Sequence, residues 1–187
     1  MANAAKTLDE IAEQINAENN KLPPVEQWNP QFSGDMDIVI NREGEWFHEG
    51  SRFERKALVK LFASILKKEG DEYYLVTPVE KFRIQVTDLP FVVTQMETID
   101  TDSAPVIKFT TNIGDEVIAD QAHPLLVDHD KESMEPQPRI LVRRNLYARI
   151  HRNVFYELVR LAEEESGPQG NQMVVHSGER KFILGHI

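Results

Sequence analysis

The segment Arg139–Arg152 contains five arginines and no acidic residue. The chain as a whole has a net charge of −10, so this segment reverses the local sign. We expect Arg143 and Arg144 at the transition from a strand to a helix with Asn145 as its N-cap, where free N–H groups and guanidinium donors bind phosphate or carboxylate. The alternative is that these arginines pair with the abundant acidic side chains.

Two aromatic side chains, Trp46 and Tyr147, offer ring faces on which a nucleobase could stack. Further polar candidates fall on expected turns and strand ends, where ligand contacts concentrate. These candidates are His48, Glu80, Asn112, Asp115 and His123. For His48, the alternative is a half-buried structural histidine.

Acidic and histidine side chains crowd between residues 115 and 130, and oxygen and imidazole ligands can bind a divalent metal. A metal-dependent hydrolase using Asp115, Asp120 and His123 is therefore one alternative. The spacing matches no known metal motif, and the chain contains no cysteine. It also has no Gly-x-Ser-x-Gly sequence and no glycine-rich phosphate loop. We assign no catalytic residue, metal or cofactor, and favour binding over catalysis.

The pattern of the middle of the chain predicts a helix followed by two strands. Ser51–Glu54 fits a capping box, an apolar stripe continues to Ile65, and Gly70 can end the helix. Strands are expected at 73–78 and 80–86. The same order recurs near the C-terminus, so Gly50–Val86 and Arg149–Ile187 indicate an internal duplication, although any two amphipathic helix–hairpin units share some similarity. A long helix is expected over Leu146–Glu165.

The remaining pattern favours consecutive hairpins. Strands are expected at 37–41 and 45–48, at 91–96, and at 106–110 and 116–119, with a hinge over 97–105. This order indicates an α+β fold of duplicated helix-plus-antiparallel-sheet units. The predicted organisation is an N-terminal arm (1–30), a first α+β lobe (31–100) and a second α+β lobe (101–187).

The composition of the 187 residues, with 41% hydrophobic side chains and no cysteine, is typical of a globular protein of a reducing compartment. The first residues lack the apolar region of a signal peptide, and no apolar run is long enough to span a membrane. These features favour a cytoplasmic protein. The net charge of −10 argues against DNA, RNA or anionic membranes as partners.

Several short motifs together resemble the bacterial domain-of-unknown-function family DUF1285, from about Trp28 to the C-terminus. They are Gly44–Gly50, Leu58–Ala63, Tyr74–Glu80, Val86–Phe91, Thr111–Asp115, His123–Leu125 and Val142–Arg143. The resemblance implies a duplicated α+β core, a C-terminal half superficially like a pleckstrin-homology barrel, and a ligand site between the halves. It also implies a nucleotide-based ligand and a role in signal transduction.

Residues and resemblance together predict a non-catalytic cytoplasmic protein that binds an anionic small molecule, such as a nucleotide, in the cleft between two lobes. Arg143 and Arg144 would hold the phosphate, and Trp46 and Tyr147 the base. The alternatives are the hydrolase described above and a protein-interaction module, which would present an apolar groove or a sheet edge to a protein partner.

Overall fold

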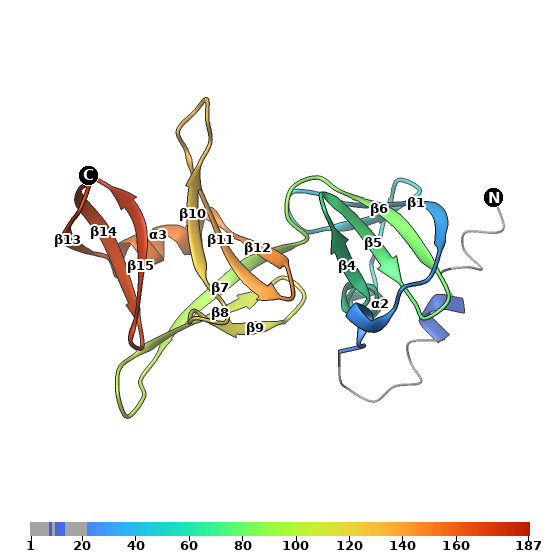
Figure 1. Ribbon diagram of the computed structural model, residues 1–187, viewed down its shortest axis with the longest axis horizontal. Coiled ribbons are helices and arrows are strands. Elements are labelled where there is room, and N and C mark those ends of the chain that lie inside the picture. The colour runs from blue at the N-terminus through green and yellow to red at the C-terminus, as the bar shows by residue number, and fades with distance from the viewer. Residues whose placement is uncertain (1–7, 9, 14–21) are drawn as a thin grey trace. The chain divides into compact units, whose positions relative to one another are not determined.

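The computed structural model describes residues 8, 10–13 and 22–187, and the chain divides into two compact units, Met1–Asp88 and Leu89–Ile187 (Figure 1). The division precedes the predicted boundary at residues 100 and 101. The predicted hinge over 97–105 is wrong, because 97–99 continue strand β7 (Phe91–Ile99), which pairs with β8 in the second unit. Of the N-terminal arm, residues 10–13 are helical and Ile11 is fully buried. The predicted capping residue Thr7 lies outside the described residues.

The first unit is built on a six-stranded sheet with the order β3-β2-β1-β6-β5-β4. Its elements are η1 (Val25–Gln27), β1 (Phe32–Ile40), β2 (Trp46–His48), β3 (Ser51–Arg52), α2 (Lys56–Ser64), β4 (Leu66–Glu69), β5 (Glu72–Val76) and β6 (Lys81–Val86). Two antiparallel meanders, β1-β2-β3 and β4-β5-β6, are joined by a parallel ladder between β1 and β6. The first and last strands of the unit are therefore hydrogen-bonded neighbours.

Alternation of apolar side chains places the core of the first unit on one face of this sheet. Met36, Ile38 and Ile40 of β1 are buried at every second position. Phe62 of α2 and Leu75 of β5 are also buried, so the helix and the second meander complete the same core.

The predicted helix from Ser51 to Gly70 is shorter in the structure. Ser51 pairs with His48 in the β2–β3 ladder, and α2 follows Arg55, which makes no side-chain capping bond. The C-terminal part of the prediction forms β4, in which Leu66 pairs with Leu75 of β5. Gly70 has φ 58° as predicted for a left-handed residue, but it lies in the β4–β5 turn. Sheet pairing has overridden helix propensity at both ends.

The second unit contains a six-stranded sheet, β10-β11-β12-β7-β8-β9, and a three-stranded sheet, β13-β14-β15. Its further elements are β8 (Val106–Thr111), β9 (Glu116–Ile118), β10 (Leu125–His129), β11 (Pro136–Arg143), β12 (Leu146–Ile150), α3 (Arg152–Arg160), β13 (Glu163–Gly167), β14 (Gly170–Ser177) and β15 (Arg180–His186). A parallel ladder joins β12 to β7. The buried Ser177 hydroxyl accepts a hydrogen bond from the Ile107 N–H at 2.9 Å and so ties β14 to β8.

The long helix predicted over Leu146–Glu165 is wrong. Its first part is strand β12, whose alternate residues Leu146, Ala148 and Ile150 are buried. Helix α3 begins at Arg152, after His151, whose side chain accepts a hydrogen bond from the Asn153 N–H at 3.3 Å. The last part of the predicted helix, from Glu163 onward, belongs to strand β13.

The predicted duplication is confirmed at the level of element order. A three-stranded meander, one helix and a second three-stranded meander follow one another in both units: β1-β2-β3, α2, β4-β5-β6 and β10-β11-β12, α3, β13-β14-β15. The fold is α+β and mostly sheet, as predicted, with antiparallel pairs prevailing. No helix among the described residues is both long and apolar enough to cross a membrane.

Candidate functional site

The predicted site residues of the first unit do not form one group. Trp46 pairs with Ile40, at the end of β1, whereas Glu80 immediately precedes Lys81, which pairs with Phe32 at the start of β1. Glu80 thus lies at the opposite end of the sheet from Trp46. It belongs to the β5–β6 turn, where its N–H donates to the Thr77 hydroxyl at 3.0 Å.

Trp46 and His48 share one face of β2 and contribute to an aromatic cluster. The Phe53 ring centroid lies 6.5 Å from that of Trp46, 6.2 Å from that of His48 and 5.9 Å from that of Phe62. Trp46 is only 2% exposed, so its ring is a core element and offers no free face for stacking. The Trp46 Nε1 and His48 Nε2 atoms are buried, and neither has a hydrogen-bond partner among the described residues.

Most of the other predicted site residues are brought together at one end of the six-stranded sheet of the second unit. The β8–β9 turn, the start of β7, the start of β10 and the β11–β12 turn all lie there, as the register of neighbouring strands shows. Asn112 ties two of these segments: its Oδ1 accepts from the Val92 N–H at 3.0 Å, and its own N–H donates to the Val92 carbonyl at 2.8 Å.

Arg143 is the central cation of this sheet end. Its Nη1 donates to the Asp115 carboxylate, and its guanidinium carbon lies 4.9 Å from the centroid of the Phe91 ring. The side chains of Arg143 and Asp115 are 10% and 24% exposed. The pair is therefore partly desolvated, and either partner would be costly to leave alone.

Arg144 and Asn145 form the two-residue turn between β11 and β12, in which Arg143 pairs with Leu146. The predicted strand-to-helix transition and the Asn145 N-cap are therefore wrong, since a second strand follows the turn. Arg144 has φ 52°, a left-handed conformation that costs about 1 kcal/mol or more for a residue with a Cβ atom. Such strain at a turn is a feature that functional sites often retain.

His123 and Tyr147 flank one residue of β11, Leu141. The Leu141 carbonyl lies 2.9 Å from His123 Nδ1, and Leu141 pairs with Tyr147 of β12. A carbonyl can only accept, so Nδ1 carries a proton and neutral His123 presents Nε2 as an acceptor. The Arg139 guanidinium lies 5.4 Å from the centroid of the Tyr147 ring and covers one of its faces.

Several arginines of the basic segment pair with acidic or polar side chains. Arg139 forms an ion pair with Asp128, and Arg149 Nη1 donates to Gln137 Oε1 at 2.8 Å. Arg139 and Arg149 are direct register partners on β11 and β12, which places two like charges opposite each other. The charges on this face thus remain predominantly positive even with Asp128 in place.

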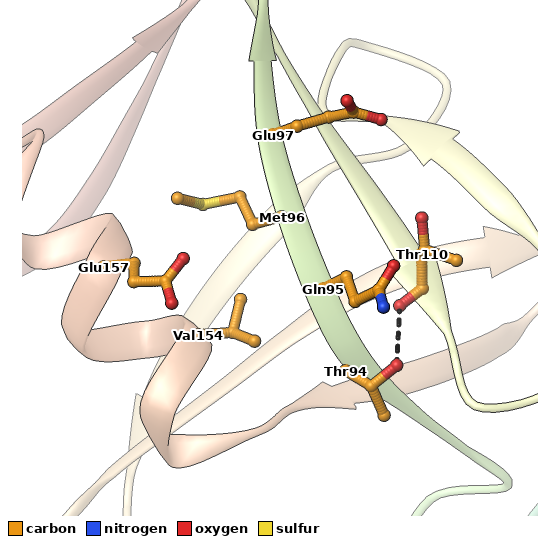
Figure 2. Close-up of a pocket in the computed structure, with 7 residues that line it drawn as sticks. All are labelled: Thr94, Gln95, Met96, Glu97, Thr110, Val154 and Glu157. Atoms are coloured by element: carbon orange, nitrogen blue, oxygen red, sulfur yellow. Dashed lines mark hydrogen bonds between the residues drawn. The ribbon is translucent and has the colours of Figure 1, made fainter.

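Sequence reasoning missed a pocket of about 320 Å³ between β7, β8 and α3. Figure 2 shows Val154 and Glu157 of α3 across from Met96, with Glu97 farther along β7. The remaining lining residues are Thr94, Gln95 and Thr110. A register shift between Val93 and Gln95 deforms β7 here. Such a bulge depends on strand pairing and leaves no signal in the sequence.

The electrostatics of this pocket suit a hydrogen-bond donor. Lys108 Nζ lies 2.5 Å from a carboxylate oxygen of Glu97, and hydrogen bonds to Glu97 and Glu116 raise the pKa of Lys108. Glu157 of α3 places a second carboxylate on the wall of this pocket. Two carboxylates on the pocket wall would repel a phosphate.

The acidic and histidine residues between 115 and 130 do not form a metal cluster. His123 N–H donates to Asp120 Oδ1 at 2.8 Å, and Asp115 is held by Arg143. Across the part of the chain that the structure describes, no group of three or more histidine, aspartate or glutamate side chains is arranged to hold a metal ion.

The chain matches two protein-family models. Residues 23–89 match the N-terminal domain of DUF1285, a domain of unknown function, and residues 90–184 match the C-terminal domain of DUF1285, a protein of unknown function. The chain belongs to the DUF1285 family. The junction of the two DUF1285 matches agrees with the division between Asp88 and Leu89.

Solved structures of DUF1285 proteins share the fold. The crystal structure of a DUF1285 family protein from Silicibacter pomeroyi DSS-3 is 40% identical, with a TM-score of 0.85, and the match covers 96% of this chain and 95% of that one. A DUF1285 family protein from Shewanella baltica OS155 is 29% identical, with a TM-score of 0.53, over 67% of this chain and 91% of that one. No curated protein sequence matches the chain. Membership in DUF1285 therefore establishes the fold and assigns no chemistry.

Proposed function

We propose that this DUF1285 protein is a non-catalytic cytoplasmic protein that binds an anionic small molecule of the nucleotide class and acts in signal transduction. The site is the end of the second unit's six-stranded sheet described above. The superficial likeness of this unit to a pleckstrin-homology barrel is part of the proposal. That the site lies in a cleft between the two halves stays a prediction.

The observation that carries the proposal is the strained Arg144 next to Arg143. Two guanidinium groups follow one another at a tight turn, and the first is held in place by Asp115 and the Phe91 ring. Glycine would satisfy the same backbone at lower cost, so an arginine at φ 52° suggests that its side chain is needed. Arginine binds phosphate with paired donors in a fixed geometry.

The neighbouring residues supply the other contacts that a nucleotide requires. The Tyr147 ring is half-buried and covered on one face by Arg139, and in the proposed site a nucleobase stacks on its other face. His123 Nε2 is positioned to accept a hydrogen bond from a ribose hydroxyl or a base amino group, because Nδ1 is held by Leu141. Asn112 lies at the same end of the sheet, fixed by its two bonds to Val92.

The test is a thermal-shift screen of the intact protein with purine and pyrimidine nucleotides, including cyclic ones. A ligand present at one hundred times its dissociation constant adds about 2.7 kcal/mol to the free energy of unfolding. Arg144→Gly should abolish most of this gain. Because this substitution also relieves about 1 kcal/mol of backbone strain, we expect the variant to fold, and its melting temperature without ligand is measured alongside.

Met134→Gly is the matched control, because Met134 has φ 59° in an exposed loop. It relieves the same kind of strain and should leave the nucleotide-induced shift unchanged. A shift that survives in Arg144→Gly, or one that disappears equally in Met134→Gly, refutes the assignment of the site.

The hydrolase that uses Asp115, Asp120 and His123 remains a prediction from sequence. Elemental analysis of the purified protein separates it from the binding proposal, because a hydrolase of this type needs a stoichiometric divalent metal.

A further inference from the structure

Helix α3 has an apolar surface on its outer side as well as on the side that it buries. Val154, Phe155 and Leu158 are buried in the second unit. Tyr156 and Val159, in contrast, are 49% and 38% exposed. They lie three residues apart, so they are neighbours on one face of the helix. The outer face of α3 is therefore apolar at a place where a surface helix normally carries polar side chains.

The corresponding helix of the first unit has a different outer face. Like α3, α2 lies between the two three-stranded meanders of its unit. The exposed side chains of α2 are Lys56, Ala57 and Lys60. Two charged side chains and a small one thus cover the outer face of α2. The exposed apolar face is particular to α3 and does not follow from the duplicated fold.

Tyr156 is held in place by the residue one helical turn before it. Arg152 Nε donates to the Tyr156 hydroxyl at 2.6 Å, and the Arg152 guanidinium lies 5.5 Å from the centroid of the Tyr156 ring. A ring that is already fixed loses less conformational entropy when a partner buries it. Tyrosine and arginine are also the side chains that often dominate the binding energy of protein interfaces. The outer face of α3 therefore suits a protein partner.

The charges around this apolar face sum to zero. Between residues 152 and 163 the chain carries two arginines and two glutamates, and all four are exposed: Arg152, Glu157, Arg160 and Glu163. The chain as a whole has a net charge of −10, so two copies repel each other over most of their surfaces. A neutral apolar face is the place where a second copy can approach with little repulsion.

The order of these residues makes the face complementary to itself. Arg152 is the first residue of α3, and Glu163 follows the helix at the start of β13. The midpoint between Arg152 and Glu163 along the chain is also the midpoint between Tyr156 and Val159. Two α3 helices packed antiparallel about a two-fold axis at this point place Arg152 of one copy opposite Glu163 of the second copy, and Tyr156 opposite Val159. Each pair then occurs twice, as an isologous interface requires.

From these observations we infer that the outer face of α3 is an interface between two copies of this chain, which pack α3 against α3 in antiparallel orientation. A stable interface buries about 800 Å² on each partner, which is more than one face of a nine-residue helix supplies. We therefore expect a weak dimer with a dissociation constant of about 1 μM or higher. The inference goes beyond the proposed nucleotide site, because the interface depends on α3 and the nucleotide site on the β11–β12 turn.

The test is sedimentation equilibrium of the intact protein over a series of concentrations up to the millimolar range, in which dimers should form. Arg152→Glu places a carboxylate opposite Glu163 at both ends of the interface and should weaken the dimer about tenfold. The variant should fold, because an acidic residue suits the first turn of a helix. Arg152→Glu combined with Glu163→Arg exchanges the two charges and should restore most of the affinity.

Tyr156→Ala tests the apolar part of the interface and should weaken the dimer about tenfold. Two matched controls should leave the dimer unchanged. Arg180→Glu makes the same charge change at an exposed position of β15, and Phe32→Ala removes a ring that is 55% exposed in the first unit. The melting temperature of each variant is measured alongside.

The inference is overturned if the protein sediments as a monomer at every concentration or if Arg152→Glu leaves the dimer unchanged. It is also overturned if exchanging the two charges does not restore the dimer, or if Arg180→Glu weakens it as much as Arg152→Glu does.

Discussion

At the scale of single residues, Arg143 fits both interpretations of the basic segment, namely pairing with an acidic side chain and a place in an anion site. It is paired with Asp115, as expected for a cation in a protein of net charge −10, and it also anchors the turn on which the proposed site depends. Arg139 likewise pairs with Asp128 while covering Tyr147. Ion pairs of these two arginines with Asp115 and Asp128 therefore agree with the pairing that the sequence offered as the alternative to anion binding.

Ion pairing also predicts how stability depends on pH in the first unit. The Lys81 ammonium donates to the Glu69 carboxylate, and this bond, with a second from Lys67, lowers the pKa of Glu69 below its ordinary 4.5. The folded state therefore gains stability above pH 4.5 and loses it as the pH falls through the lowered pKa.

We expect Lys81→Met to lower the free energy of unfolding by about 0.5 kcal/mol at neutral pH, the value typical of a partly exposed ion pair. The difference from wild type should shrink in acid, once Glu69 is protonated in both proteins. Urea denaturation at several pH values measures it. A difference that persists unchanged in acid would show that lost packing, and not the ion pair, is responsible.

The chemical character of the candidate residues could be predicted better than the residues that each of them contacts in the fold. The basic segment, the polar turn residues and the possibility of acidic partners followed from the sequence. The burial of Trp46 did not, because an amphipathic aromatic residue fits a core and a binding face equally well. The separation of Glu80 from Trp46 depends on the parallel ladder between β1 and β6, which no local pattern encodes.

At the scale of elements, the errors share one physical cause. Residues 146–150 have the alternation of a strand, but they directly precede an amphipathic helix, so the apolar pattern predicts one continuous helix. Likewise, Ser51 suits a helix N-cap but pairs with His48. Hairpins with strong turn signals were predicted correctly: Ile40 pairs with Trp46, and Thr110 with Glu116. Short strands next to helices are decided by tertiary pairing.

The connection between the two sheets of the second unit depends on a buried hydrogen bond. Ser177 is 3% exposed and Ile107 is 2% exposed, so Ser177→Ala leaves the Ile107 N–H buried without its partner. We expect a loss of about 1–3 kcal/mol in the free energy of unfolding.

Chemical denaturation measures this loss, with Ser166→Ala as the control. Ser166 is exposed on β13, and its replacement should change stability by less than about 0.5 kcal/mol. Equal effects of the two substitutions would show that the bond between β14 and β8 contributes little.

At the scale of the whole molecule, the order of meander, helix and meander occurs twice along the chain. Two units with the same order of elements provide an internal comparison, and the differences between them indicate what is special to each. One such difference is that β1 and β6 form a parallel ladder, whereas β10 and β15 are edge strands of separate sheets. The family and the duplicated α+β fold were predictable from sequence, whereas this difference in strand pairing required the structure.

The nucleotide proposal makes its most direct prediction for the amide resonances of the isotope-labelled intact protein. On titration with the nucleotide that gives the largest thermal shift, the largest changes should fall in the β8–β9 turn around Asn112 and in Arg143–Tyr147. They should be absent in Arg144→Gly and present in Met134→Gly. Changes centred elsewhere, or none with any nucleotide at millimolar concentration, would contradict the proposed site.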